Sequence, residues 1–96
     1  MKYIKKKLAI DNVRLVDIAR KFDTPTYCYS YTQLKKNINS FKKNFKTFSP
    51  LICFAIKSNT NLNLIKEIQK FGLGADVVSM GELMMALKAG INPKKI

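Results

Sequence analysis

The chain has 96 residues and a net charge of +12, with 18 lysine and arginine side chains against 6 acidic ones. That length supports one small core and excludes a complete (β/α)8 barrel, which takes about 250 residues. The chain contains no histidine, which excludes a histidine-based catalytic triad or metal cluster formed from these residues alone.

The basic charge invites a nucleic-acid interpretation, but the residue types argue against one. Sixteen of the 18 basic residues are lysine, and only Arg14 and Arg20 are the type preferred for bidentate contacts to phosphate and guanine. Most of the lysines fall on the polar faces of predicted helices, which is typical of a solvated surface. We therefore predict no nucleic-acid partner.

Neither a targeting signal nor a cysteine site is apparent. The first apolar run, Leu8 to Ile10, is too short for a signal peptide, and no run approaches a membrane span. Cys28 and Cys53 are far apart in the sequence and each lies in a predicted strand, so we expect two buried free thiols. These features predict a cytoplasmic protein with no membrane partner.

The first half of the chain predicts a helix, a strand and a second helix, after a short strand around Leu8 to Ile10. Apolar residues at helical spacing predict a helix over 15–23, ended by the Thr24-Pro25 step. Residues 26–31, TYCYSY, alternate large and small side chains and predict a strand. Ser30 or Thr32 can cap the next helix. Its apolar stripe is expected to face inward and consists of Leu34, Ile38, Phe41, Phe45 and Phe48.

The second half alternates strands and helices. Residues 51–56, LICFAI, form an unbroken apolar run that predicts a strand buried on both faces. The polar cluster 58–61 supplies a cap for a helix that Gly72 ends, and residues 73–78 predict a second strand. The buried face of this helix is expected to comprise Leu64, Ile65, Ile68 and Phe71.

A further helix is predicted from a capping box, because Ser79 and Glu82 stand in the Ser-x-x-Glu arrangement. This helix should end at Gly90, and Ile96 should begin another strand. Its inner side is expected to carry Leu83, Met84 and Leu87.

The alternation of strands and helices predicts right-handed βαβ crossovers and a parallel sheet, which is the α/β class. Periodicity alone does not choose between an open doubly wound sheet and the first part of a barrel. No G-x-G-x-x-G stands between a strand and its helix, so nothing favours a dinucleotide-binding fold.

Lys57 directly follows the central apolar run and is predicted to lie where this strand ends. Burial at that position would remove water from the ammonium and favour its uncharged, nucleophilic form. Such an amine reacts with carbonyls, including the aldehyde of pyridoxal phosphate. The pattern also permits a second interpretation, in which Lys57 is a solvated charge at the rim of the sheet.

Three motifs together carry a resemblance to a known family: DIARKFDTPTYCY at 17–29, FAIKSNTN at 54–61 and GADVVSMGEL at 74–83. In this order and spacing they resemble the N-terminal part of the diaminopimelate decarboxylases. These are pyridoxal-phosphate enzymes with an alanine-racemase-like (β/α)8 barrel of the TIM type and a second β domain. The resemblance covers residues 15–96 and implies decarboxylation of meso-diaminopimelate to L-lysine and CO2, in lysine biosynthesis.

The resemblance implies roles for five residues. Lys57 would hold pyridoxal phosphate covalently, yield it to the substrate amine and later return a proton. Asp76 matches a family position close to the cofactor and the lysine, where its carboxylate influences the charge state of the amine. Ala55, two residues before the lysine, would point the same way and leave room for the cofactor ring. Ser79 and Glu82 match positions near the active site, and their capping-box role explains them equally well.

The resemblance also divides the chain. Residues 1–31 would form an N-terminal extension with a short helix and a strand of the β domain, and residues 32–96 would form the first βα units of the cofactor-binding barrel. The family's stacking histidine, phosphate-binding loop, substrate-binding arginines and partner-supplied cysteine segment are expected after residue 96. We therefore expect these 96 residues alone to bind the cofactor weakly and to be inactive. The full-length enzyme is expected to be a homodimer that acts on a small amino acid.

Other functions stay open on the sequence. Another decarboxylase of the same family, acting on ornithine, arginine or carboxynorspermidine, fits the same motifs, because substrate choice depends on downstream residues. A non-catalytic pyridoxal-phosphate carrier would keep the barrel and Lys57 but lack the second β domain, and the strand predicted at 26–31 counts against it. The charge alone would suit a small basic module that binds RNA or acidic surfaces.

Overall fold

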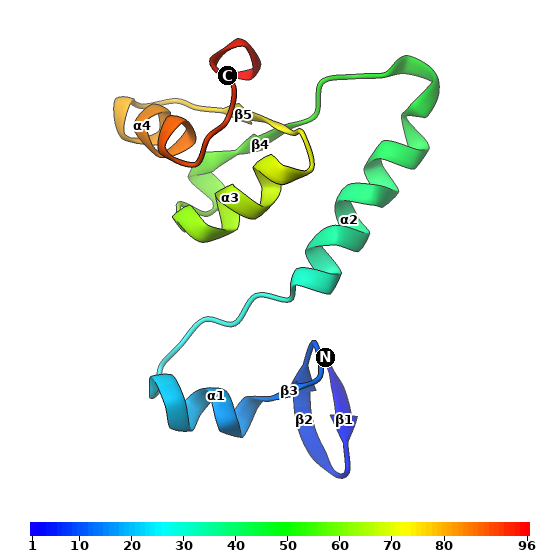
Figure 1. Cartoon of the computed structure of the whole chain (residues 1–96), viewed down its shortest axis with the longest axis vertical. Coiled ribbons are helices and arrows are strands. Elements are labelled where there is room, and N and C mark those ends of the chain that lie inside the picture. The colour runs from blue at the N-terminus through cyan, green and yellow to red at the C-terminus, as the bar shows by residue number, and fades with distance from the viewer. The chain divides into compact units, whose positions relative to one another are not determined.

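The computed structural model describes all 96 residues, which form two compact units, residues 1–44 and residues 45–96. Figure 1 shows the elements of each unit along the chain. None of the helices combines the length and the apolar character that a membrane crossing requires.

The first unit begins with a three-stranded antiparallel sheet in the order β1-β2-β3. Its strands are β1 (Lys2–Ile4), β2 (Lys7–Ile10) and β3 (Val13–Arg14). The two-residue turns that join them, Lys5-Lys6 and Asp11-Asn12, have positive φ at both positions, which suits tight hairpins. The strand expected around residues 8–10 is therefore confirmed as β2. The sequence analysis missed its two neighbours, because the lysine-rich segments around them lack apolar alternation.

Helix α1 (Leu15–Phe22) packs beside this sheet and ends before the Thr24-Pro25 step, as predicted. Helix α2 (Tyr31–Asn44) is capped by Ser30, whose Oγ accepts a hydrogen bond from Gln33 N at 3.0 Å. Asp11, in the β2–β3 turn, accepts from Thr32 N at 3.0 Å and from Ser30 Oγ at 2.7 Å. These hydrogen bonds hold the pKa of the Asp11 carboxyl below its usual value, and the bond from the Thr32 backbone has the largest effect.

Two predictions for the first unit are wrong. Residues 26–30 are not a strand, and residue 31 already belongs to α2. The segment pairs with no strand of the sheet, and the Tyr27 side chain is 90% exposed, because β propensity alone does not supply a neighbouring ladder. Of the apolar stripe on α2, Ile38 is buried, but three phenylalanines of the stripe are exposed. They are Phe41 in α2, and Phe45 and Phe48, which follow the end of α2 and lie in the second unit.

The second unit is a βαβα arrangement around two parallel strands. After the 3-10 helix η1 (Lys46–Phe48), β4 (Cys53–Ala55) leads into a second 3-10 helix, η2 (Ile56–Ser58), and then α3 (Leu62–Lys70). Next come β5 (Gly74–Asp76), α4 (Met80–Lys88) and a last 3-10 helix, η3 (Pro93–Lys95). The parallel pairing of β4 with β5 confirms the α/β class.

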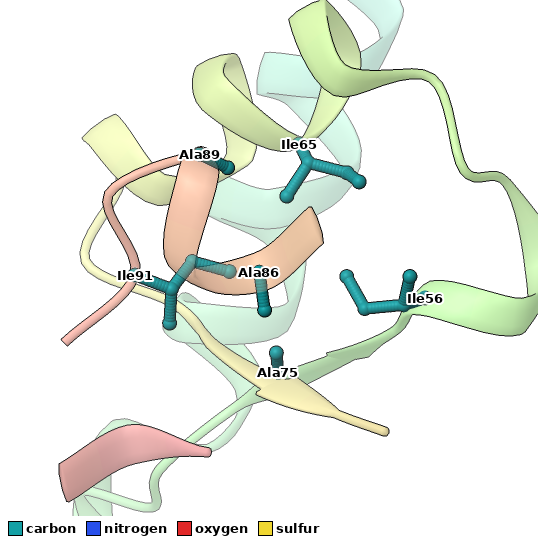
Figure 2. Packing of buried hydrophobic residues seen from close by; sticks show 6 residues of the cluster. All are labelled: Ile56, Ile65, Ala75, Ala86, Ala89 and Ile91. Carbon is teal, nitrogen blue, oxygen red and sulfur yellow. The ribbon is translucent and has the colours of Figure 1, made fainter. Parts of the chain in front are cut away.

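The core of the second unit lies between this strand pair and its helices. Figure 2 shows side chains from η2, from β5, from α3, from α4 and from the segment after α4 meeting in one cluster. Its members are Ile56, Ile65, Ala75, Ala86, Ala89 and Ile91. A buried isoleucine contributes about 1.5–3 kcal/mol relative to an exposed one, so three in one cluster account for much of the stability of so small a unit.

The ends of the helices follow the predicted signals. The Asn61 side chain caps α3 by accepting from the backbone N–H groups of Asn63 and Leu64, at 3.0 and 3.1 Å. Gly72 follows α3 with φ of +78°, a conformation in which a side chain would be strained. The predicted inner residues Ile65 and Ile68 of α3 are buried, and Gly90 follows α4.

Several details of the second unit correct the sequence analysis. The strand predicted over 51–56 is only Cys53–Ala55 and is not buried on both faces, because helices cover one face and β5 is its single neighbour. The strand predicted over 73–78 is likewise shorter, Gly74–Asp76. Ile96 packs against the core after η3, and the strand expected to begin there stays a prediction.

Side-chain burial also differs from the predictions in two places. On α4, Met84 and Leu87 are exposed, because the helix turns its small residues Ala86 and Ala89 toward the core. Cys28 and Cys53 were expected to be buried, and both are exposed free thiols.

Candidate active site

Two of the residues singled out in the sequence, Ala55 and Asp76, lie at one edge of the β4–β5 pair. Ala55 is the last residue of β4, Asp76 is the last residue of β5, and the two are partners in the parallel register. In parallel α/β sheets the carboxyl ends of the strands form the edge where ligands bind. Ala55 and Asp76 therefore lie side by side at the edge where chemistry is expected.

The two strands direct Asp76 away from the core. Ala75 is buried in the core cluster, and Phe54 and Val77 pack against it. Because successive side chains of a strand point to opposite faces, Ala55 and Asp76 belong to the face that the helices do not cover. In agreement, Ala55 is half-buried and Asp76 is exposed.

Lys57 lies two residues beyond the end of β4, in the middle of the 3-10 helix η2. The turn is closed by a hydrogen bond from Asn59 N to Ile56 O at 3.0 Å, and the Ile56 side chain is fully buried. Lys57 itself is exposed and forms no salt bridge. The expectation that this ammonium loses water at the end of a buried strand is therefore wrong for these residues. The strand is short and flanked on one side only, so it does not enclose the side chain.

A residue that the sequence analysis did not select completes this turn. The Ser58 hydroxyl donates to the Ala55 carbonyl oxygen at 2.7 Å, which ties the turn that carries Lys57 back to the end of β4. In the sequence, Ser58 was one of several polar residues that could cap α3. The structure assigns that cap to Asn61 and leaves Ser58 with a different role.

Ser79 and Glu82 organise the loop that follows Asp76. Ser79 Oγ accepts from Glu82 N at 3.2 Å, which is one half of the predicted capping box. The Glu82 carboxylate accepts from Val78 N at 2.9 Å, one residue earlier than the standard box requires. Both bonds hold the segment between Asp76 and α4, and the carboxylate lies where the dipole of α4 favours negative charge.

The chemistry of these side chains suits one end of pyridoxal phosphate. An accessible primary amine on Lys57 can bond to an aldehyde carbon, and the Asp76 carboxylate on the adjacent strand can balance positive charge. The Ala55 side chain at the end of β4 is small and takes little space. The arrangement therefore fits the aldehyde end of the cofactor.

Comparison with known proteins agrees with this fit. The model of the family described as pyridoxal-dependent decarboxylase, pyridoxal binding domain, matches residues 31–96. The chain belongs to this family. The motifs around Lys57 and Asp76 both fall within the matched residues.

Members of this decarboxylase family resemble the chain along its whole length. A diaminopimelate decarboxylase of Aquifex aeolicus is 42% identical over all 96 residues, and one of Vibrio cholerae is 38% identical over 94% of the chain. The crystal structure of diaminopimelate decarboxylase from M. jannaschii in complex with L-lysine matches 98% of the chain with a TM-score of 0.92 and 34% identity. The chain spans only 22% of the two relatives and 23% of the M. jannaschii chain.

Proposed function

We propose that these residues form the N-terminal part of a pyridoxal-phosphate-dependent decarboxylase that converts meso-diaminopimelate to L-lysine and CO2. The observation that carries the proposal is the placement of Lys57 and Asp76 at one edge of a parallel strand pair, in a chain of the pyridoxal-binding family. The L-lysine in the M. jannaschii structure supports this substrate, because lysine is the product of the proposed reaction.

The proposal includes a larger architecture. Residues 32–96 would supply the first βα units of a (β/α)8 barrel, and residues 1–31 would contribute to a second β domain. The start of the family match at residue 31 and the parallel β4–α3–β5 unit support this division. A homodimer is proposed on the family resemblance, and both the homodimer and the cytoplasmic location stay predictions.

The proposed chemistry divides between the cofactor and the chain. Bound pyridoxal phosphate supplies an aldehyde that condenses with a primary amine, with loss of water, and a ring that takes up the electron pair left by departing CO2. Lys57 would hold the cofactor through its Nζ atom, which must first give up a proton, because only the neutral amine is a nucleophile. The same Nζ atom would also carry a proton to the reacting carbon late in the reaction.

Asp76 and Ala55 would complete the site beside this amine. Asp76 ends the neighbouring strand as the register partner of Ala55, so its carboxylate would add negative charge at the edge where the cofactor binds. Ala55 keeps the end of β4 free of bulk. The loop after Asp76 is held by Ser79 and Glu82, so the carboxylate is carried on an ordered segment.

Borohydride trapping tests the proposal. The polypeptide made from the complete gene is incubated with one equivalent of pyridoxal phosphate, reduced with borohydride and digested, and the labelled peptide is located by mass spectrometry. We expect the label on Lys57 and release of CO2 from meso-diaminopimelate by the unreduced protein. Lys57→Ala should abolish both signals, because the proposal assigns to Lys57 both the covalent attachment of the cofactor and the return of a proton.

Lys66 provides a matched control, because it is an exposed lysine on α3, outside the candidate site. Lys66→Ala should keep both the label and the decarboxylation. A label that stays in Lys57→Ala, or one that maps to Lys66 and spares Lys57, would contradict the proposed role.

A further inference from the structure

We propose that Ser58 is a positioning residue for Lys57, an inference that rests on the proposed function. Its hydroxyl fixes the turn that presents the lysine, through the hydrogen bond to the Ala55 carbonyl oxygen at 2.7 Å. Ser58 touches neither substrate nor cofactor in this proposal and acts only through the backbone that carries Lys57.

The turn is anchored on both sides of Lys57. On the N-terminal side, the Ile56 side chain is fully buried in the core cluster, which ties the turn to α3 and α4. On the C-terminal side, Ser58 Oγ returns to the end of β4, and Asn59 N closes the same turn on Ile56 O at 3.0 Å. The backbone of Lys57 is thereby held while its side chain stays exposed.

The acceptor of the Ser58 bond links this turn to Asp76. Ala55 supplies the carbonyl group and is also the register partner of Asp76. Ala55 is therefore connected both to the turn that carries Lys57, through Ser58, and to the strand that carries Asp76. A lysine side chain has four rotatable bonds, so a loosened backbone would add further freedom to an amine that must meet one carbon atom.

Loss of one exposed hydrogen bond predicts a modest kinetic effect. Ser58→Ala should slow the appearance of borohydride-trapped label on Lys57 roughly 2- to 10-fold, the range set by one hydrogen bond. Ser58→Thr keeps a hydroxyl that can donate to the Ala55 carbonyl, and should label within about twofold of the wild-type rate.

Ser49 offers a matched control elsewhere in the same unit. It follows the 3-10 helix η1, and its Oγ donates to the carbonyl of Lys46, also three residues earlier, at 3.5 Å. Ser49→Ala thus removes the same kind of bond from a turn that carries no candidate site residue, and should leave the labelling rate unchanged.

The experiment measures the rate of Lys57 labelling and its pH profile in the polypeptide made from the complete gene, with urea unfolding of each variant alongside. The inference is supported if Ser58→Ala slows labelling or shifts its pH profile under conditions where the variant is folded, and Ser58→Thr restores both. It is overturned if Ser58→Ala labels like the wild type, if threonine does not restore the rate, or if Ser49→Ala slows labelling equally. Failure of the wild type itself to label at Lys57 would instead defeat the proposed function, and this inference with it.

Discussion

The two units of the chain use their apolar residues differently. Eight of the ten buried hydrophobic residues lie in the second unit, residues 45–96, and the first unit contributes only Ala9 and Ile38. The second unit brings together strands and helices that are close in sequence, so its local pattern completes a core within 52 residues, 45–96. The first unit has hairpins and helices of correct local chemistry but leaves most of its aromatic side chains exposed.

This difference explains where the candidate site lies. Reactive side chains need a backbone held by packing, because a misplaced amine or carboxylate loses most of its effect. Lys57 follows the buried Ile56, and Asp76 follows the buried Ala75, so both belong to segments anchored in the core of the second unit. Substitutions in the two units should therefore have unequal effects on stability.

The largest expected effect comes from removing a core side chain of the second unit. Ile65→Ala should lower the free energy of unfolding by about 2–5 kcal/mol, because Ile65 is fully buried and its deletion leaves a cavity. Tyr27→Ala in the first unit is the matched comparison, and it should change the value by less than about 0.5 kcal/mol, because Tyr27 is 90% exposed. Urea unfolding followed by circular dichroism measures both. Equal losses for the two variants would remove the contrast between the units.

A smaller loss of stability is expected at Gly74 in β5, where the backbone of η3 lies close to the strand. A Cβ on Gly74 would collide with the Lys95 carbonyl oxygen and lie 2.9 Å from Cys53 Sγ. Gly74→Ala should therefore cost about 1–3 kcal/mol of unfolding free energy, as overpacking usually does.

Gly81 is the control for this substitution. It lies in α4, and a Cβ there would meet only Ser79 Oγ at 3.9 Å. Gly81→Ala should stabilise the protein by about 0.4–1 kcal/mol, because alanine loses less backbone entropy in a helix. A Gly74→Ala variant as stable as Gly81→Ala would show that η3 does not press against β5.

The smallest effect concerns pH and belongs to the first unit. Hydrogen bonds from Thr32 N and Ser30 Oγ lower the folded-state pKa of Asp11 below its ordinary value of 3.8. The carboxylate therefore contributes stability that is complete above that value and is lost as the pH falls through the lower, folded-state pKa. Asp11→Asn should be less stable than the wild type at about pH 6, with a difference that shrinks toward about pH 2.

Thermal unfolding at several pH values measures this trend. Asp23→Asn serves as the control for removing an exposed carboxylate from the same unit, because no hydrogen bond joins Asp23 to another residue. If the difference in stability between Asp11→Asn and the wild type stays constant with pH, the Asp11 carboxylate does not stabilise the start of α2 as proposed.

Much of the second unit could be predicted from residues that act locally. Asn61 and Ser79 cap helices through their own side chains, and Gly72 ends one through its backbone freedom, so a short stretch of sequence suffices to place each of them. The apolar run before Lys57 likewise placed this residue after the first of two parallel strands, whereas the closeness of Asp76 was implied only by the family resemblance.

The wrong predictions concern features that depend on residues distant in the sequence. Residues 26–30 have strand-forming composition but no pairing strand, and Met84 and Leu87 have helical spacing but face solvent. The Ser58 hydrogen bond was also missed, because its acceptor is a backbone carbonyl that any residue at position 55 would carry. In each case the outcome depends on a neighbour that the local pattern does not specify.

By itself, the sequence determined the alternation of strands and helices in the second unit, the helix caps, and the position of Lys57 directly after the first strand. Only the tertiary structure decided which faces are covered, that Lys57 is exposed on a 3-10 turn, and that Ser58 ties this turn to the partner of Asp76. The reason is physical: capping and periodicity are settled over a few residues, whereas burial and cross-strand register depend on segments brought together from elsewhere in the chain.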